Sequence, residues 1–396
     1  MKSNGPPDSP ATRLATRLSF FATGFATACW APLVPFAKFR LGIDDGGLGL
    51  LLLCLGMGSL VVMPATGGLV GRFGSRRVLL VSGAAVSLAL PLLATASSVG
   101  ILAMALLLFG ASLGAMDVAM NIHAVEVERG SPHPLMSGFH GLFSVGGFAG
   151  AGFITALLAS GVSLAIASVV AVAVVLTSLG IAAPRFLETR IGSSAPFFVR
   201  PRGLVLLLGV LAFVAFLVEG AILDWSALLL TQHRGFATTQ GGVAYALFSV
   251  AMTAGRLTGD RVVARLGERP MLILGGLLTS LGLVTVLVAP WSSMALCGFV
   301  LIGLGASNIV PILFSGAGRQ TAMPMGLAIA SMTTLGYAGI LAGPAAIGFV
   351  AQASSLPAAF ILLAVLMLVV PLCAGAVTRK RGGSDAGRAW SPSDGP

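Results

Sequence analysis

The residues best suited to chemistry are acids set inside long apolar stretches. Asp117 lies in the stretch 99–124, which is otherwise apolar enough to cross a membrane, and Asn121 follows four residues later. That spacing places both side chains on one face of a helix. An ionisable group at membrane depth costs about 2.5 to 3.5 kcal/mol on insertion scales and usually faces a cavity or a polar partner. We therefore expect Asp117 to carry a proton and Asn121 to bind a solute hydroxyl group or to orient Asp117; the alternative is a structural pair that fixes helix packing.

Two further acids lie in the stretch 203–230. Glu219 is deeper in this stretch than Asp224. Because they are five residues apart, they point about 140° away from each other on a helix and do not form a tight pair. We expect Glu219 to take part in proton coupling and Asp224 to contact the solute nearer the outer end. Trp225 is either an interfacial anchor or a surface on which a sugar ring stacks.

Histidine and aromatic residues supply a second group of candidates. His140 could share the proton with Asp117, since histidine changes charge near physiological pH, although a buried structural histidine is the plainer alternative. Trp30 and Tyr337 are candidates for solute binding or for packing. His123 lies near a loop and is expected to be in solvent.

The charged residues expected at mid-membrane are three acids, and no base is expected among them. An anionic solute would lack a countercharge there, so the sequence favours a neutral polar or cationic solute. No phosphate-binding loop, no Gly-x-Ser-x-Gly and no metal-binding histidine pair is found. We therefore expect no enzyme activity, no cofactor and no bound metal.

The elements that must position these residues are membrane-spanning helices. The chain is 56% hydrophobic and 9% charged, with a mean hydropathy of +0.99, and soluble domains are about 25% charged. Twelve stretches have about the length of 20 residues that crosses a bilayer. They are 16–38, 46–70, 77–97, 99–124, 134–159, 163–183, 203–230, 239–260, 270–289, 293–316, 324–350 and 356–377.

The distribution of basic residues predicts the orientation. With twelve spans both termini lie on one side, and 20 of the 23 lysines and arginines fall on that side. Lys38, Arg40 and Arg234 fall on the other. Positive residues mark the cytoplasmic side, so we expect both termini to be cytoplasmic and expect no nucleic-acid partner despite the net charge of +10.

The longest polar interruption, 184–202, divides the spans six and six. We expect a disordered cytoplasmic N-terminus at 1–15, a six-helix bundle at 16–183, a cytoplasmic linker at 184–202, a second bundle at 203–377 and a disordered tail at 378–396. The loop sequence Gly-Arg-Phe-Gly-Ser-Arg at 71–76 matches Ala-Arg-Leu-Gly-Glu-Arg at 264–269. Such a repeat indicates two parallel halves with a site between them near the bilayer midplane.

Twelve spans in two halves, with a G-R-x-G-x-R type loop after spans 2 and 8, resemble the major facilitator superfamily. The resemblance implies an all-α membrane protein with two pseudo-symmetric six-helix bundles. The usual acid before the loop arginine is absent, and Asp260 stands four residues before Ala264. We expect the cytoplasmic gate to use Arg72, Arg265 and a substitute pair formed by Arg256 and Asp260.

Two motifs narrow the resemblance. The Asp117-x-x-x-Asn121 pattern and the sequence Ser-Gly-Phe-His-Gly at 137–141 are similar to the fucose:proton symporter family. With Glu-Gly-Ala-Ile-Leu-Asp-Trp-Ser at 219–226, the chain most resembles the YbjJ-type group of bacterial inner-membrane permeases. The resemblance implies a monomeric permease of the inner membrane whose partners are a small solute, protons and the lipid bilayer.

Three functions fit these patterns. The first is a proton-coupled importer of a small neutral, sugar-like solute that works by alternating access. The second is a proton antiporter that exports a metabolite or a drug-like compound. The third is a sensor or scaffold without transport, against which the cost of acids inside the fourth and seventh spans argues.

Overall fold

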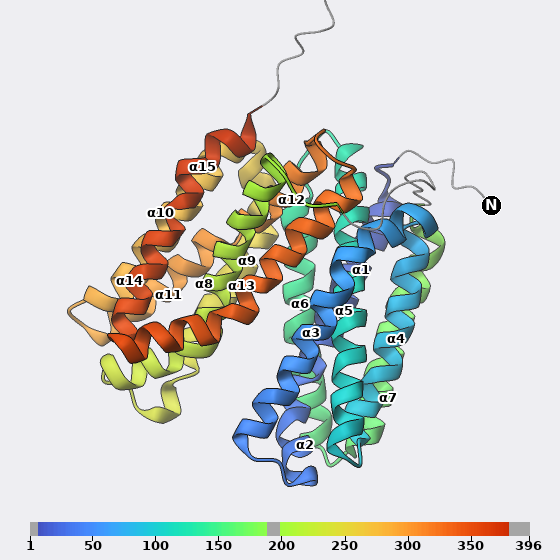
Figure 1. The fold of residues 1–396 in the computed structure, drawn as a ribbon, viewed down its shortest axis with the longest axis horizontal. Coiled ribbons are helices and arrows are strands. Elements are labelled where there is room, and N and C mark those ends of the chain that lie inside the picture. Colours follow the sequence, from blue (N-terminus) through green and yellow to red (C-terminus); the bar gives the residue numbers. More distant parts are fainter. Residues whose placement is uncertain (1–6, 188–198, 380–396) are drawn as a thin grey trace, which may run out of the picture.

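The computed structural model describes residues 7–187 and 199–379, and the elements in those residues are helices (Figure 1). The first bundle contains α1 (Pro10–Cys29), η1 (Ala31–Leu33), α2 (Val34–Leu41), α3 (Asp45–Phe73), α4 (Ser75–Thr95), α5 (Val99–Arg129), α6 (Met136–Ala159), α7 (Leu164–Ala182) and η2 (Ala183–Arg185). The second bundle contains α8 (Leu204–His233), η3 (Thr238–Gln240), α9 (Val243–Leu266), α10 (Glu268–Val288), α11 (Ser292–Ala306), α12 (Ile309–Arg319), α13 (Met325–Ala353), α14 (Leu356–Met367) and α15 (Val369–Thr378).

Eleven helical segments of the described chain are long and apolar enough to cross a membrane. Four of them are composite, because α1 with η1 and α2, α7 with η2, α11 with α12, and α14 with α15 each form one segment. The twelfth crossing is α9, whose 24 residues suffice in length but include four charged side chains. The structure thus has the two bundles of membrane-crossing helices that the sequence indicates.

The first helix begins earlier than expected. Ser9 caps α1 by accepting a hydrogen bond from the Thr12 amide, and Pro10 occupies the first helical position, where proline is well tolerated. Residues 10–15 are therefore helical and not part of a disordered N-terminus. Residues 1–6, 188–198 and 380–396 lie outside the described residues, and with them most of the expected linker and tail.

Small residues bring helices of one bundle into close contact. In α6, a Cβ atom added at Gly146 would lie 2.2 Å from the Phe21 carbonyl oxygen of α1, and one at Gly150 would lie 2.2 Å from that of Phe25. A Cβ at Gly24 of α1 would meet the Phe143 carbonyl oxygen of α6 at 2.0 Å. Glycine is therefore required on both helices for their backbones to approach this closely.

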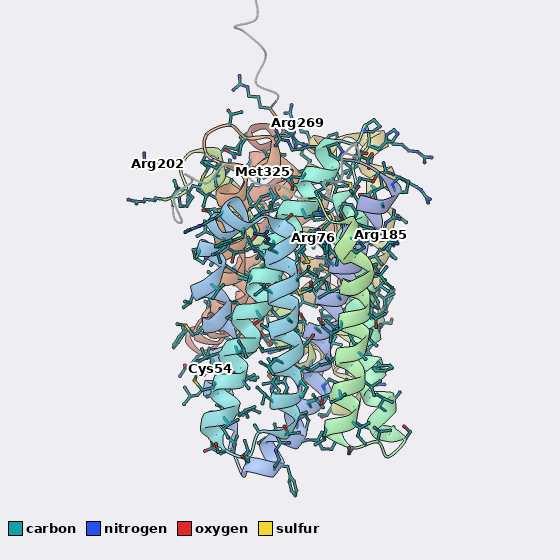
Figure 2. All side chains as sticks on the ribbon, turned by 90° about the vertical axis from the view of Figure 1, so that its right-hand side faces the viewer. Cys54, Arg76, Arg185, Arg202, Arg269 and Met325 are labelled. Atoms are coloured by element: carbon teal, nitrogen blue, oxygen red, sulfur yellow. The ribbon has the colours of Figure 1, made fainter. Side chains whose placement is uncertain are left out.

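Arginine side chains gather at one end of the helices, which we call the basic end. Arg76, Arg185, Arg202 and Arg269 lie there, whereas Cys54 lies toward the opposite end (Figure 2). Both α1 and α15 have their chain-terminal ends at the basic end (Figure 1).

Two of the three bases expected at the opposite end cap helices. Arg40 donates to the carbonyl oxygens of Leu93, Ala94 and Ala96 at the C-terminus of α4, at 3.2, 2.7 and 2.8 Å. In the second bundle, Arg234 donates to the carbonyl oxygens of Leu287, at 3.2 Å, and Ala289 at the C-terminus of α10. The internal repeat therefore extends to these caps, where a cation offsets the partial negative charge of a helix end.

His123 is buried, in contrast to the expectation that it is in solvent. Its Nε2 accepts a hydrogen bond from the Leu187 amide at 3.0 Å, so the neutral ring carries its proton on Nδ1, which lies 3.0 Å from Thr16 Oγ1. The Phe186 ring packs edge-on against the imidazole. The end of the first bundle is thereby fixed to α5 and α1, because a chain segment beyond the last span folds back over the histidine.

Candidate functional site

Four ionisable side chains lie at similar depth in the middle of the membrane-crossing helices. At a rise of about 1.5 Å per residue, Arg256 lies about 15 Å from the basic end of α9, and Asp117 about 18 Å from that of α5. Tyr337 lies about 18 Å from the basic end of α13, and Glu219 about 22 Å from that of α8. These residues come from both bundles and share one layer of the structure.

Asp117 is buried, with 8% of its surface exposed. Within the described residues no hydrogen bond or ion pair of its carboxyl group is found, and Tyr337 of the other bundle lies close enough to interact with it electrostatically. The Asn121 amide donates to the Asp117 backbone carbonyl oxygen at 2.9 Å, so it does not orient the carboxyl group. Asn121 Oδ1 is buried without a hydrogen-bond partner. An acid without a partner at this depth is readily neutralised by a proton.

Arg256 lies at mid-membrane, in contrast to the expectation that it belongs to a cytoplasmic gate. Its Nη2 is 3.5 Å from Glu219 Oε1, and its Nη1 donates to Ser144 Oγ of α6 at 3.0 Å. The side chains of Arg256 and Glu219 are 9% and 16% exposed. The expectation that mid-membrane lacks a base is therefore wrong. The reason is that α9 continues to Leu266, so Arg256 lies well inside the helix and not near its end.

His140 lies in α6 between two aromatic rings. Its ring centroid is 5.1 Å from that of Phe20 and 5.4 Å from that of Phe314, which belongs to α12 of the other bundle. Nδ1 is buried without a hydrogen-bond partner. The described contacts include no hydrogen bond from His140 to Asp117, and the charged group that acts on the imidazole is Arg256. His140 therefore belongs with the arginine at the boundary between the bundles.

The tryptophan candidates lie farther from the basic end. Trp30 and Trp225 are each about 30 Å from the basic ends of α1 and α8 at the helical rise. Trp30 is buried, and the indole Nε1 atoms of both residues are buried without partners. The Trp225 ring packs beside Gly348 of α13. Asp224, next to it, is exposed, so these residues line the side of the layer away from the basic end.

The four residues expected to form the cytoplasmic gate do not lie together in the structure. Asp260 Oδ2 accepts a hydrogen bond from the Gly138 amide at 3.0 Å, which joins α9 of the second bundle to the first turn of α6. The expected Arg256–Asp260 pair is not formed, because Arg256 points to Glu219 and Ser144. Arg72 and Arg265 are exposed, and the Arg72 guanidinium lies 5.4 Å from the centre of the Phe73 ring. Of the four, Asp260 is the one that bridges the bundles near the basic end.

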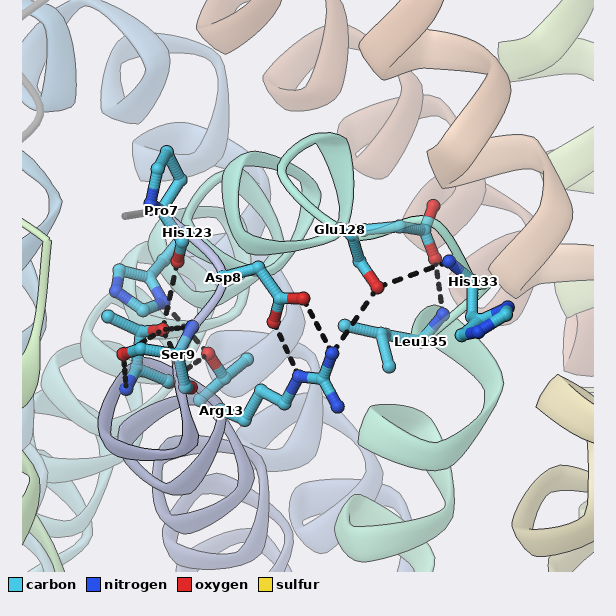
Figure 3. Close-up of polar contacts among 11 residues, drawn as sticks. Pro7, Asp8, Ser9, Arg13, His123, Glu128, His133 and Leu135 are labelled. Atoms are coloured by element: carbon cyan, nitrogen blue, oxygen red, sulfur yellow. Dashed lines mark hydrogen bonds and ion pairs between the residues drawn. The ribbon is translucent and has the colours of Figure 1, made fainter. Parts of the chain in front are cut away.

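Sequence reasoning missed Glu128, which closes the contact between the bundles. Its Oε2 accepts a hydrogen bond from the Leu135 amide at 2.7 Å (Figure 3) and one from the Met136 amide at 2.8 Å. Its Oε1 accepts a hydrogen bond from Ser315 Oγ of α12. A carboxylate at a helix N-terminus is favourable because the amides there have no partners within the helix. An acid six residues before the expected start of the span 134–159 was the available signal. Ser144 was missed because a serine within an apolar helix has no distinguishing pattern.

Two helical bundles with ionisable groups buried between them at mid-depth are typical of secondary transporters built from parallel repeats. Comparison with known proteins agrees. Residues 18–324 match the Major Facilitator Superfamily, and residues 207–391 give a second match. The chain belongs to this superfamily of membrane transporters, and it is a multi-pass transporter and not an enzyme.

Several relatives match almost the whole chain. An uncharacterized MFS-type transporter of Yersinia pestis is 52% identical over 369 residues, which cover 93% of this chain and 96% of the relative. Membrane protein MosC of Rhizobium meliloti is 33% identical, over 95% of this chain and 93% of that protein. These relatives support the superfamily but do not single out the YbjJ-type group within it.

Solved structures agree on the fold. The Escherichia coli fucose:proton symporter is 16% identical, with a TM-score of 0.76 over 95% of this chain and 100% of that chain. The human organic anion transporter MFSD10 is 17% identical, with a TM-score of 0.74 over 93% of this chain and 100% of that chain. At such low identity the likeness concerns the fold alone.

Proposed function

We propose that the protein is a proton-coupled secondary transporter that moves a small polar solute by alternating access, with Asp117 as the residue that carries the proton. The observation that supports this most directly is the burial of the Asp117 carboxyl group at mid-membrane without a hydrogen bond or ion pair in the described residues. A structural acid at this depth would be expected to have such a partner.

The proton gives this arrangement a function in transport. A protonated Asp117 is neutral, so the bundles can reorient without carrying an unpaired charge through a medium of low dielectric. Moving one charge across the membrane field is worth about 2.3 kcal/mol per 100 mV, so the proton can drive the accumulation of a solute.

The solute is proposed to carry hydroxyl groups. The indole nitrogens of Trp30 and Trp225 are buried without partners on the side of the layer away from the basic end, and Asn121 Oδ1 is buried without a partner on the side toward it. Groups of these types suit a polyol or sugar-like molecule, which would meet them at different depths as it crosses. A neutral solute remains compatible with the site, because Glu219 offsets the charge of Arg256. The resemblance to the fucose:proton symporter family points to the same class of solute.

We further propose that the solute is imported together with the proton. The protein would act as a monomer in the inner membrane, with its basic end in the cytoplasm as the distribution of arginines indicates. Export by proton antiport is the second candidate. The direction of solute movement under an imposed pH gradient distinguishes the two.

The test uses proteoliposomes that contain a pH-sensitive dye. A panel that includes L-fucose, D-xylose, D-galactose, D-galacturonate and D-gluconate is added outside, and the protons that enter with the solute are recorded. Asp117→Asn should abolish proton entry while solute exchange between the two sides persists. Ser112→Ala is the matched control in the same helix, because the Ser112 hydroxyl donates to the Leu108 carbonyl oxygen of its own helix. Proton entry that is equal in Asp117→Asn and the wild type would overturn the assignment of the carrier.

A further inference from the structure

The ion pair between Arg256 and Glu219 is loose for a buried pair. The distance from Arg256 Nη2 to Glu219 Oε1 is 3.5 Å, beyond the 2.7 to 2.9 Å or so of a strong charge-assisted hydrogen bond. Arg256 Nε and Glu219 Oε1 are both buried without hydrogen-bond partners. A guanidinium that is buried to this extent normally has more of its donors satisfied. Arg256 therefore retains donors that another acceptor can use.

The position of the pair means that an acceptor bound there would affect the contact between the bundles. The Glu219 side chain is 16% exposed and that of Arg256 is 9% exposed, so Glu219 is the more accessible side chain of the pair, although its Oε1 atom is buried. Arg256 also donates to Ser144 across the boundary between the bundles. An anion that replaces Glu219 at the guanidinium would act directly on a contact between the two bundles.

We propose that Arg256 is the anion-binding residue of the solute site, and that the solute is a hydroxylated monocarboxylate. This deepens, and rests on, the function proposed above. In the empty protein Arg256 is paired with the Glu219 carboxylate. When Glu219 takes up a proton it becomes a neutral acid, and Arg256 binds the carboxylate of the solute in its place. The Arg256–Glu219 pair keeps the same net charge, because the proton on Glu219 offsets the negative charge of the solute. Asp117 carries a second proton, so two protons enter with each anion.

The other ionisable groups near the pair are compatible with this exchange. His140 of α6 interacts electrostatically with Arg256 from the first bundle, and Asp260 lies one turn along α9 with its carboxylate bound to the Gly138 amide. Asp117 of α5 and Tyr337 of α13 interact with each other. Arg256 is thus the one permanently charged base among these described groups, and a bidentate guanidinium is well suited to a carboxylate.

The first experiment removes Glu219 and supplies formate as the probe. Thermal unfolding of purified Glu219→Ala in detergent should shift upward by about 3 °C with saturating formate at pH 7.5. The wild type should shift less, because its own carboxylate occupies the guanidinium. Glu219→Ala/Arg256→Met is the matched control and should not respond. Glu219→Gln serves as a second variant if the alanine variant does not fold. An equal response to formate in the wild type and both Glu219 variants overturns the proposal.

The second experiment compares matched acids and neutral sugars on the wild type. D-galacturonate is compared with D-galactose, and D-gluconate with D-sorbitol. The acid of a pair should bind more tightly, and its affinity should rise as pH falls from 7.5 to 5.5, by up to about tenfold per pH unit for one coupled proton. A neutral member that binds better than its acid overturns the solute class. If proton entry that depends on Asp117 persists with that neutral sugar, the proposed function stands and only the anion site fails.

Discussion

At the scale of single residues, Ser144 ties the buried arginine to the opposite bundle. Ser144 Oγ accepts from Arg256 Nη1 at 3.0 Å, and a hydrogen bond to a charged group contributes about 1.5 to 3 kcal/mol. Ser144→Ala should therefore lower the thermal unfolding temperature by several degrees. Thr155→Ala in the same helix should leave it unchanged, because the Thr155 hydroxyl donates to the Ala151 carbonyl oxygen of its own helix. Equal unfolding temperatures of the two variants would show that the Ser144 contact is not formed in solution.

A second prediction at this scale concerns Asp8, which lies before the first span. Hydrogen bonds from Arg13 lower the pKa of Asp8 below its ordinary value. The pair should therefore contribute stability that is fully present above about pH 4, the ordinary pKa of an unfolded aspartate, and that is lost as pH falls through the lower folded value.

Asp8→Asn tests this contribution. Its effect on the free energy of unfolding should be small, at most about 1 kcal/mol for a partly exposed pair. The effect should be constant between pH 5 and 8 and should shrink on acidification below about pH 4. A loss that instead grows toward acid pH would contradict the pairing.

For the candidate residues, the sequence predicts the depth in the membrane but not the interaction partners. The depth of Asp117 and Glu219 follows from their positions in apolar stretches, and the structure places both in the same layer. Their partners do not follow, because the pairing of Arg256 with Glu219 and Ser144 depends on how three helices pack. The apolar count also ends the eighth span too early, at residue 260, because the exposed Arg261 and Arg265 lower the hydropathy of the last turns of α9.

At the scale of helices, the packing of α1 against α6 depends on glycine. Gly146→Ala would place a Cβ atom 2.2 Å from a backbone carbonyl oxygen of α1, which forces the helices apart. Gly152→Ala is the matched control, because nothing lies within 4 Å of its added Cβ. We expect Gly146→Ala to lower the unfolding temperature by about 2 to 6 °C and Gly152→Ala to leave it equal or slightly higher. Similar unfolding temperatures would mean that the helices can separate without cost.

The contact of Asp260 with the first turn of α6 predicts a local effect. The Gly138 amide lies in the part of a helix whose amides lack partners within the helix, and Asp260 supplies one from the other bundle. Asp260→Ala should speed hydrogen–deuterium exchange at residues 136–141, because the contact at the basic end opens more often. Thr258→Ala should not, since Thr258 is exposed and donates to the Ala254 carbonyl oxygen of its own helix. Unchanged exchange in Asp260→Ala would count against a gating role.

At the scale of the whole molecule, the two bundles meet toward the basic end. Hydrogen bonds from Ser315 to Glu128 and from Gly138 to Asp260 cross between them there. The ribbons of the two bundles diverge toward the end that carries α2 (Figure 1). The sequence predicted two bundles from the loop repeat, but which end is closed depends on contacts between residues far apart in the chain.

A disulfide across the closed end tests whether it must open. A Cβ atom on Gly318 of α12 would lie 3.6 Å from the Val125 Cβ of α5, within the range of about 3.5 to 4.5 Å found in disulfides. Val125→Cys with Gly318→Cys, in a background without Cys29, Cys54, Cys297 and Cys373, should lose transport on oxidation and regain it with dithiothreitol. Gly318→Cys alone is the control. Transport by the oxidised pair would show that this end stays together throughout the cycle.

The arginine caps at the end opposite the basic end affect the free energy needed to separate the two bundles there. Arg40 holds carbonyl groups of the first bundle, and Arg234 holds those of the second. Each guanidinium is thus satisfied by its own half, and the halves can separate around these two residues without breaking their bonds. At the other end, separation breaks bonds that join one half to the other. The end that carries Arg40 and Arg234 can therefore open without loss of these hydrogen bonds, whereas opening the basic end breaks hydrogen bonds between the bundles.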